Sequence, residues 1–401
     1  MTGMSARATE DRATEDHGTE DHATEDHATE YHGTGDLPAM DVPGRLGRLR
    51  AAMAARECEA LLVSNLVNVR YLSGFTGSAG FLLVRADEAV LVTDGRYGTQ
   101  APAELEAAGA AVRAQVRPAS QQDELLAGLA GGLQRLGLEA EHVSWGRQRH
   151  FDQTWARGVE LVATEGLVER LRERKDAGEL ARIAAAARIA DRALANVRGL
   201  LDATPTEVEV ALALDTEMRR LGASGPAFET IVAAGANAAE PHHHPSPRPV
   251  KRGELVVVDF GARVDGYCSD MTRCLWAGTG PDGATARLAE ILGVVRAAQE
   301  AGLGAVADGV PAVEVDRACR EVVEAADLGE YFVHGTGHGV GLVIHEPPWA
   351  RPASEDILWS GQVVTVEPGV YIPGLGGARI EDTVVVTGSG CEVLTLTPKQ
   401  A

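Results

Sequence analysis

The stretch Glu254–Trp276, ELVVVDFGARVDGYCSDMTRCLW, has the pattern of a β-hairpin. Its aliphatic run Leu255–Val258 predicts a buried strand, and the dipeptide Asp265-Gly266 predicts a two-residue turn. The residues after the turn predict a second strand that returns beside the first. If the two turn residues form the whole loop, Val264 pairs with Tyr267, and this pairing sets the register of the rest of the hairpin.

The predicted register brings two acidic residues to one face of the hairpin. Asp259 lies opposite Thr272, and Asp270 becomes its diagonal neighbour, about 7 to 8 Å away. Two ionised carboxylates beside an apolar strand repel each other and lose hydration, so they need a cation, a shared proton or water. A solvated surface hairpin would explain this pair taken alone, but the rest of the chain favours a site.

Composition limits the classes of function. The chain has 401 residues, enough for two domains, and 45% of them are hydrophobic, as in a globular protein. Its net charge of −21 argues against nucleic acids and acidic membranes as partners. No apolar stretch is long enough to span a bilayer and the N-terminus is polar, so we expect a cytoplasmic protein. The five cysteines form no CxxC pair and are odd in number, which predicts reduced thiols and no zinc-thiolate site.

Residues 1–40 differ from the rest of the chain. Five-residue units such as ATEDH repeat in tandem, and the segment holds ten acidic residues, two arginines and almost no large apolar side chain. Such a segment cannot offset its ordering entropy by burial, so we expect a disordered acidic repeat tail. A tail, or a start codon that is not used, explains the repeat better than metal capture by its regularly spaced histidines.

The remaining residues divide into two predicted domains. Residues 41–165 alternate strand-like and helix-like segments, with helices expected near 100–108 and 123–136, which predicts an α/β domain. This domain has no cluster of carboxylates and histidines, so we expect it to wall a site or to mediate association. Residues 166–401 begin with a long alanine-rich helix over 168–197 and then repeat an order of helix, helix and strands. We therefore predict an α+β domain with an internal repeat and a site where its halves meet.

Two sequence signals refine the second domain. Thr206 and Glu209 form a capping box that predicts the start of a helix, and Gly222 predicts its end. In the second half we expect helices near 284–301 and 311–326, and strands at 331–335, 363–372 and 378–387.

Three histidines lie close together in the segment HGTGHGVGLVIHEPP, at His334, His338 and His345. The glycines between them disfavour a helix and allow close backbone approach to a ligand. Three histidines in twelve residues favour a site over core packing. The segment imitates a phosphate-binding loop, but it completes neither the dinucleotide fingerprint nor a Walker lysine, so we do not expect nucleotide binding.

Further acids follow these histidines. Glu367 ends the strand VVTVE, and Arg379 and Glu381 share one face of the next predicted strand, where an internal ion pair would also explain them. Across the domain, four acids and one histidine converge from strands or adjacent loops: Asp259, Asp270, His338, Glu367 and Glu381. Mostly oxygen ligands with one imidazole suit Mn²⁺, Co²⁺ or Zn²⁺, and such a set can bridge two ions.

These motifs resemble a known family. In order and spacing, PHHH at His242, VVDFGARVDGYCSDMTR, HGTGHGVGLVIHEPP, VEPGVY and GGARIEDTV are similar to proline-specific metallopeptidases with the pita-bread fold. These enzymes are Xaa-Pro aminopeptidase and Xaa-Pro dipeptidase, also called prolidase. YLSGFTGS and TDGRY resemble their creatinase-type N-terminal domain. The resemblance covers Val42–Thr397 and implies a creatinase-like domain at 41–165 and a pita-bread catalytic domain at 166–401.

The resemblance also implies an activity and its metal ligands. The expected reaction is hydrolysis of the peptide bond before a proline at the second position of dipeptides or short peptides. It would need two divalent ions, with Mn²⁺ expected first and Co²⁺ or Zn²⁺ as alternatives. Asp259 would bind one ion, Asp270 and Glu381 would bridge both, and His338 with Glu367 would complete the second.

Other residues would act beside the ions. The resemblance implies that Glu367 is also the general base, that His242, His334 and His345 contact substrate, and that the charge of Arg379 offsets the carboxylates. Arg351 is a candidate for holding the free carboxylate of a dipeptide, although a solvated loop arginine explains it equally well. Members of this family commonly form homodimers through the N-terminal domain.

Rival functions follow from the same resemblance. Creatinase shares the architecture but works without metals, and noncatalytic pita-bread binding proteins are expected to lack ligands. All five ligand positions here carry ligating side chains, which favours the peptidase. Methionine aminopeptidase does not need the additional N-terminal domain.

Overall fold

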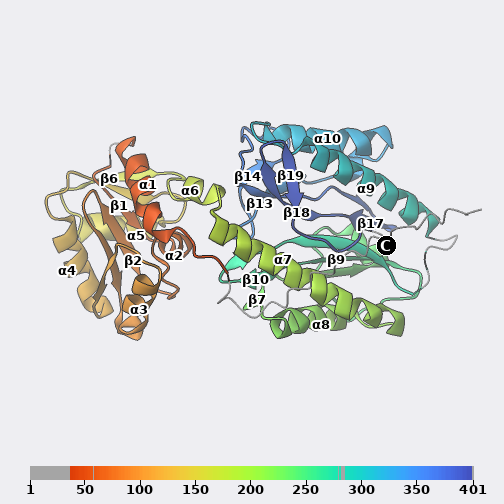
Figure 1. The fold of residues 1–401 in the computed structure, drawn as a ribbon, viewed down its shortest axis with the longest axis horizontal. Helices are drawn as coiled ribbons and strands as arrows, with labels where there is room; N and C mark the ends of the chain where they lie inside the picture. Colours follow the sequence, from red (N-terminus) through yellow and green to blue (C-terminus); the bar gives the residue numbers. More distant parts are fainter. Residues whose placement is uncertain (1–36, 57, 279, 281–284, 400–401) are drawn as a thin grey trace, which may run out of the picture. The chain divides into compact units, whose positions relative to one another are not determined.

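The computed structural model describes residues 37–56, 58–278, 280 and 285–399 (Figure 1). Of the predicted tail at 1–40, residues 1–36 therefore lie outside the described residues. In the described part of the chain, no helix is both long and apolar enough to cross a membrane.

The N-terminal domain is built on a six-stranded mixed sheet of order β4-β3-β2-β1-β5-β6. Its strands are β1 (Ala60–Val63), β2 (Phe81–Arg85), β3 (Ala89–Thr93), β4 (Arg113–Val116), β5 (Arg135–Glu139) and β6 (Glu160–Thr164). Its helices are α1 (Val42–Ala54), α2 (Leu66–Ser73), α3 (Gln100–Ala107), α4 (Ala119–Ala130) and α5 (Trp145–Gln153), and α6 (Glu169–Glu173) follows the last strand in the connection to the next domain. The α/β class predicted for this region is therefore confirmed.

Alternation along β1 explains why both faces of this sheet are covered. Leu61 and Val63 pack with apolar residues of α1, α2 and α3, whereas Ala60 and Leu62 pack with those of α4 and α5. Successive side chains of a strand point to opposite faces, so a wholly apolar strand needs a core on each side.

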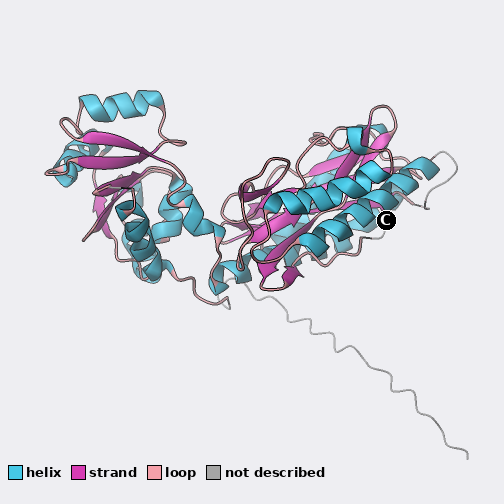
Figure 2. Cartoon of the chain, turned by 90° about the horizontal axis from the view of Figure 1, so that it is seen from above, coloured by secondary structure: helices cyan, strands magenta, loops and turns pink. Residues whose placement is uncertain are grey.

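In its described residues, the C-terminal region contains four long helices and several short sheets (Figure 2). The helices form two contacting pairs, α7 (Ala177–Val197) with α8 (Glu207–Arg220) and α9 (Ala286–Ala305) with α10 (Ala312–Ala325). The first half contains the sheets β12-β9-β8 and β11-β10-β7, and the second contains β14-β13-β15-β18-β19 and β16-β17. The α+β class and the repeated order of helix, helix and strands agree with the prediction.

The strands of this region carry or adjoin the candidate site residues. In the first half they are β7 (Gly225–Pro226), β8 (Ile231–Ala234), β9 (Leu255–Phe260), β10 (Ala262–Val264), β11 (Tyr267–Cys268) and β12 (Met271–Trp276). In the second half they are β13 (Gly337–Gly339), β14 (Glu346–Ala350), β15 (Val363–Val366), β16 (Gly369–Ile372), β17 (Gly376–Arg379), β18 (Asp382–Thr387) and β19 (Gly390–Val393).

The hairpin has the register that its turn predicts. Val264 pairs with Tyr267 and Asp259 pairs with Thr272, with both turn residues at positive φ. The ladder is interrupted at Gly261, where a Cβ atom would lie 1.8 Å from the carbonyl oxygen of Ser269. Only glycine permits that approach, and it splits the hairpin into β9-β12 and β10-β11.

Several local predictions were wrong. The strands expected over 363–372 and 378–387 are each interrupted, because β15 ends at Val366 and β17 ends at Arg379, so Glu381 lies between two strands. The helix expected over 168–197 breaks between α6 and α7, because Asp176 caps α7 through a capping box with Glu179. The helix expected over 123–136 ends at Ala130, before two glycines, and a strand begins at Arg135. Residues 331–335 form no strand and instead follow a short 3₁₀ turn, Gly329–Tyr331. The capping box of Thr206 with Glu209 is present as predicted.

Candidate metal centre

A cavity of about 370 Å³ gathers all the residues that the sequence singled out. They come from strands or adjacent loops of both halves of the C-terminal region: His242, Asp259, Asp270, His334, His338, His345, Arg351, Glu367, Arg379 and Glu381. Residues more than one hundred positions apart therefore share one small volume.

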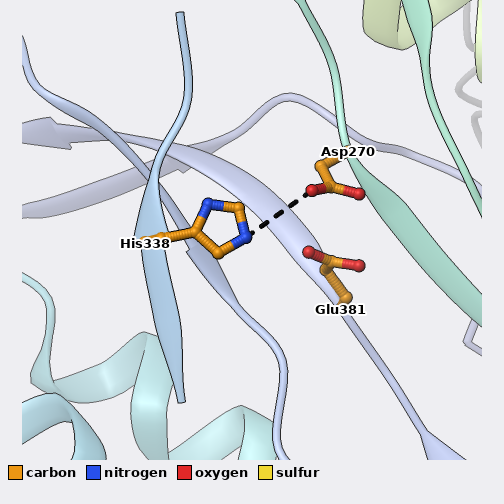
Figure 3. Close-up of side chains that lie close together, drawn as sticks. All are labelled: Asp270, His338 and Glu381. Carbon is orange, nitrogen blue, oxygen red and sulfur yellow. Dashed lines mark ion pairs between the residues drawn. The ribbon is translucent and has the colours of Figure 1, made fainter. Parts of the chain in front are cut away.

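Three side chains that could ligate a metal ion lie close together in this cavity. Asp270, His338 and Glu381 each offer one ligand atom, and these atoms lie within 4.8 Å of one another (Figure 3). Nε2 of His338 is 3.7 Å from Oδ2 of Asp270. Two carboxylates and an imidazole at this spacing can share a divalent cation.

Asp259 accepts a short hydrogen bond from Arg379. Nη2 of Arg379 donates to its Oδ2 atom at 2.6 Å. The other oxygen, Oδ1, is buried and has no hydrogen-bond partner among the described residues. An unpartnered buried carboxylate oxygen is costly, and a cation bound at this position would satisfy it.

Glu381 and Arg379 are linked through Thr272. The hydroxyl of Thr272 donates to Oε2 of Glu381 at 2.8 Å, and Nε of Arg379 donates to that hydroxyl oxygen at 3.1 Å. As the predicted register requires, Thr272 pairs with Asp259 across the hairpin, and its hydroxyl binds Glu381 and Arg379. The sequence reasoning assigned no function to this threonine.

His338 and Glu367 form a second pair in the cavity. Nδ1 of His338 lies 3.1 Å from the carbonyl oxygen of Gly339, and Nε2 lies 3.2 Å from Oε1 of Glu367. Burial alone would lower the pKa of His338, but the hydrogen bond and charge of Glu367 raise it. Burial would raise the pKa of Glu367, but His338 lowers it to about 2. Without a cation, the pair therefore favours an imidazolium beside a carboxylate.

For Asp270 and Glu381, in contrast, the pKa is raised. Burial, followed by the charges of Glu381 and Asp259, raises the pKa of Asp270 well above its usual value. Burial and the charges of Glu367 and Asp259 likewise raise the pKa of Glu381. Acids crowded without enough positive charge hold protons, and a divalent cation would replace those protons. These residues therefore fit a metal site.

His334 and His345, which are not among the predicted metal ligands, differ in their contacts. Nδ1 of His334 lies 2.7 Å from the carbonyl oxygen of Gly335, and its Nε2 lies 2.9 Å from the hydroxyl of Tyr371. The ring of His345 lies edge-on to that of His338, with centroids 4.4 Å apart. Burial lowers the pKa of both His334 and His345, which favours neutral rings.

Tyr371 is a site residue that the sequence reasoning missed. Its hydroxyl accepts from Nη1 of Arg379 at 2.7 Å and also contacts His334. It pairs with Gly377 across β16 and β17, so the opposite position carries no side chain. A tyrosine facing a glycine next to predicted ligands is a signal that could have indicated it.

The glycines around the histidines approach protein atoms. A Cβ atom at Gly337 would lie 2.0 Å from the carbonyl oxygen of Thr365, and one at Gly339 would lie 2.2 Å from that of Pro347. We expected these glycines to allow approach to a ligand, whereas here they allow β13 to pack between β14 and β15. This packing carries His338 into the cavity.

Comparison with known proteins agrees with this architecture. The profile of metallopeptidase family M24 matches residues 181–388, and that of the creatinase/prolidase N-terminal domain matches residues 45–174. The chain belongs to metallopeptidase family M24. This M24 peptidase is 36% identical over 362 residues to the uncharacterized peptidase YqhT of Bacillus subtilis (strain 168), covering 89% of this chain and 99% of that protein.

Solved structures give the same result. The M24 peptidase resembles the Xaa-Pro dipeptidase from Bacillus anthracis with a TM-score of 0.84 and 36% identity, over 90% of this chain and 99% of that chain. It also resembles the X-Pro aminopeptidase from Thermotoga maritima MSB8, with a TM-score of 0.79 and 33% identity over 87% and 99% of the two chains. The predicted resemblance and fold class are thus confirmed, including the creatinase-type domain.

Proposed function

We propose that this M24 peptidase hydrolyses the Xaa-Pro bond at the N-terminus of dipeptides or short peptides with two divalent ions. The observation that carries the proposal is the cavity in which Asp270, His338 and Glu381 cluster beside the unpartnered Oδ1 atom of Asp259. The names of the similar dipeptidase and aminopeptidase structures support the choice of substrate.

We assign the metal ligands as the family resemblance implies. Asp259 would hold one ion, Asp270 and Glu381 would bridge two, and His338 with Glu367 would complete the second. Mn²⁺ is the proposed ion, with Co²⁺ or Zn²⁺ as substitutes, because an oxygen-rich set with one imidazole accepts all three. When bound, such ions lower the pKa of water and polarise a carbonyl oxygen.

Glu367 and Arg379 are the proposed acid–base and charge-balancing residues. His338 lowers the pKa of Glu367 to about 2, so this carboxylate is ionised at neutral pH and available to a cation. Its assignment as general base follows from the family resemblance. Arg379 holds Oδ2 of Asp259 and, through Thr272, orients Glu381. Its fixed charge would offset the excess of carboxylates.

We propose different roles for the three histidines that are not metal ligands, His242, His334 and His345. Both ring nitrogens of His334 already have partners, so we propose that it shapes the cavity together with Tyr371. His242 and His345 also line the cavity. We propose that these two contact the substrate and stabilise the tetrahedral intermediate or the leaving nitrogen.

Selection of proline has a physical basis. An Xaa-Pro bond is a tertiary amide without an N–H group, and its ring has a fixed shape. Phe228, Ile231 and Trp349 give the cavity an apolar wall that could accept such a ring. Arg351, whose guanidinium lies 5.2 Å from the ring centroid of Trp349, is the proposed anchor for the carboxylate of a dipeptide.

A single set of assays tests the proposal. The protein is dialysed against a chelator, its metal content is measured, and turnover of Ala-Pro, Ala-Pro-Ala and creatine is followed with Mn²⁺, Co²⁺ or Zn²⁺. We expect two ions per chain and metal-dependent cleavage of Ala-Pro. Metal-free protein without peptide turnover would favour a binding protein, and turnover of creatine without metal would favour a creatinase-like amidinohydrolase.

We propose that the enzyme works in the cytoplasm. All five cysteines are unpaired, which fits the reducing cytoplasm. We also propose a homodimer, on the strength of the family resemblance. Sedimentation of the full chain would test this, and a monomer at micromolar concentration would contradict it.

A further inference from the structure

A buried group of charges lies directly beside the proposed substrate-contacting histidine. Glu346, the residue after His345, is 5% exposed. Its carboxylate contacts Nη2 of Arg172 and lies 2.9 Å from Nζ of Lys175. Both cations are also buried. Burial favours the neutral acid, but the charges of Lys175 and Arg172 lower the pKa of Glu346, so it remains ionised.

The buried charges connect to the N-terminal domain. Nη1 of Arg172 donates to Oδ1 of Asn68 at 2.8 Å, and Nδ2 of Asn68 donates to Oε1 of Glu139 at 2.8 Å. The other oxygen of Glu139 accepts the backbone N–H groups of Ser64 and Asn65. A continuous chain of hydrogen bonds therefore runs from the end of β5 to the first residue of β14.

The backbone around Glu346 leaves room for its carboxylate. Gly341 lies where a Cβ atom would be 2.3 Å from Oε1 of Glu346. The first residue of β14 pairs with Gly339 of β13, the residue after His338. The position of Glu346 is thus fixed by its strand partner and by two cations from the segment around α6.

His345 itself lacks a comparable anchor. In the described part of the chain, its ring nitrogens make no hydrogen bond, and its ring packs edge-on against His338. His345 lines both the metal cavity and a second cavity of about 620 Å³ that Arg172 and Glu346 also line. Its orientation must therefore come from the backbone on either side, and Glu346 anchors one side.

We propose that Glu346, Arg172 and Lys175 form a positioning cluster that holds His345 over the metal centre, with Asn68 tying this cluster to the N-terminal domain. The proposal deepens the proposed function and rests on it. A buried ion pair gives little stability over well-packed apolar residues, so orientation is a reason for these charges to be present. The N-terminal domain thereby contributes to turnover without touching the substrate.

The test compares two buried arginines that each bind acidic residues far away in the sequence. Arg172→Met removes the link to Glu346 and Asn68 and leaves Lys175 beside Glu346. Arg45→Met is the matched control, because Arg45 is 1% exposed and pairs with Asp176 and Glu179 away from the metal cavity. The melting temperature and bound metal of each variant are measured with kcat and KM for Ala-Pro.

We expect Arg172→Met to lower kcat by about 10- to 100-fold with little change in KM and with bound metal retained. Arg45→Met should lower the melting temperature but keep kcat within about twofold. In the background of His345→Ala, Arg172→Met should have almost no further effect on kcat, because both changes remove the same interaction. A structural role alone would not produce this non-additivity.

The outcomes separate this proposal from the proposed function. Equal losses of kcat in Arg172→Met and Arg45→Met, or full additivity of Arg172→Met with His345→Ala, would overturn the positioning role. Absence of Ala-Pro turnover by the metal-loaded wild-type enzyme would instead overturn the proposed function. If Arg172→Met does not fold, Arg172→Lys is used with the same comparisons. This variant keeps the positive charge but loses the planar guanidinium that binds Asn68 and Glu346 at the same time.

Discussion

Arg379 contacts more of the proposed metal centre than its charge alone would suggest. Its guanidinium donates to Asp259, to the hydroxyls of Thr272 and Tyr371, and to the carbonyl oxygen of Pro241. A planar fork can make these bonds in several directions at once, whereas an ammonium group cannot. Its geometry, as well as its charge, therefore orients the acids.

Arg379→Lys should lower kcat/KM for Ala-Pro by about 10- to 100-fold, since the groups that orient ligands commonly have effects of this size. Steady-state kinetics at saturating Mn²⁺ would measure it, with Arg317→Lys as the control. Arg317 forms exposed ion pairs on α10, where the same exchange should change little. An unchanged kcat/KM in Arg379→Lys would contradict the orienting role.

Asp270 should make the metal-free protein less stable at neutral pH. The pKa of Asp270 is higher in the folded protein than in the unfolded chain. Its contribution to stability is therefore fully present below the unfolded-state pKa and is lost as the pH rises through the folded-state pKa. Metal-free Asp270→Asn should therefore melt above metal-free wild type at pH 8, and the difference should shrink toward pH 4. Each pKa unit corresponds to about 1.4 kcal/mol.

Thermal melts in chelator across this pH range would measure the effect of Asp270→Asn. The exposed Asp202 provides a control, because Asp202→Asn removes the same charge from the surface. A metal-free Asp270→Asn that melts below wild type at pH 8 would show that burial and the neighbouring charges do not make this carboxylate destabilising.

At the scale of elements, β13 depends on the absence of side chains. It lies between β14 and β15, and His338 at its centre reaches the cavity only because the glycines on either side allow this packing. The short strand is therefore a support for one ligand, with little apolar burial of its own.

Gly337→Ala should destabilise the protein by at least ~1–3 kcal/mol, because the new Cβ atom would meet the carbonyl oxygen of Thr365 and backbone must move. It should also weaken metal binding by displacing His338. Gly293→Ala on α9 is the matched control, since nothing lies within 4 Å of its Cβ position. That helix position should gain about 0.5–1 kcal/mol. Chemical denaturation would measure both, and equal stabilities would contradict the packing argument.

At the scale of the whole molecule, bound ions should join the two halves of the C-terminal region. Asp259 and Asp270 come from the first half, whereas His338, Glu367 and Glu381 come from the second. Unfolding separates these ligands, so ions that bind only the folded chain stabilise it by mass action.

Mn²⁺ should therefore raise the melting temperature, with about 2.7 kcal/mol for each ion at a free concentration of 100 times its Kd. The increase should be larger at pH 8 than at pH 6, because protons on Asp270, Glu381 and His338, whose pKa values are all raised, compete with the ions. Calorimetry with Mn²⁺ or chelator would measure this. Asp270→Asn should lose most of the increase, and an increase that grows on acidification would refute the competition.

Some structural features of this protein follow from short-range patterns in its sequence. The turn Asp265-Gly266 sets the pairing of Asp259 with Thr272, because a two-residue loop allows one register. The capping box at Thr206 likewise acts within four residues. Ten candidate site residues came from the sequence and its family motifs, and the structure brings them to one cavity.

Other features were decided only by tertiary structure. The capping box that starts α7 and so divides the predicted long helix was less evident from composition than the alanine-rich pattern around it, so local helix propensity misled the prediction. The unpartnered oxygen of Asp259, the contact of Tyr371 with His334, and the contact of Glu346 with Arg172 each depend on how distant segments pack. Sequence periodicity specifies which face of a strand a residue occupies, but hydrogen-bond partners depend on side-chain rotamers and on neighbours far along the chain.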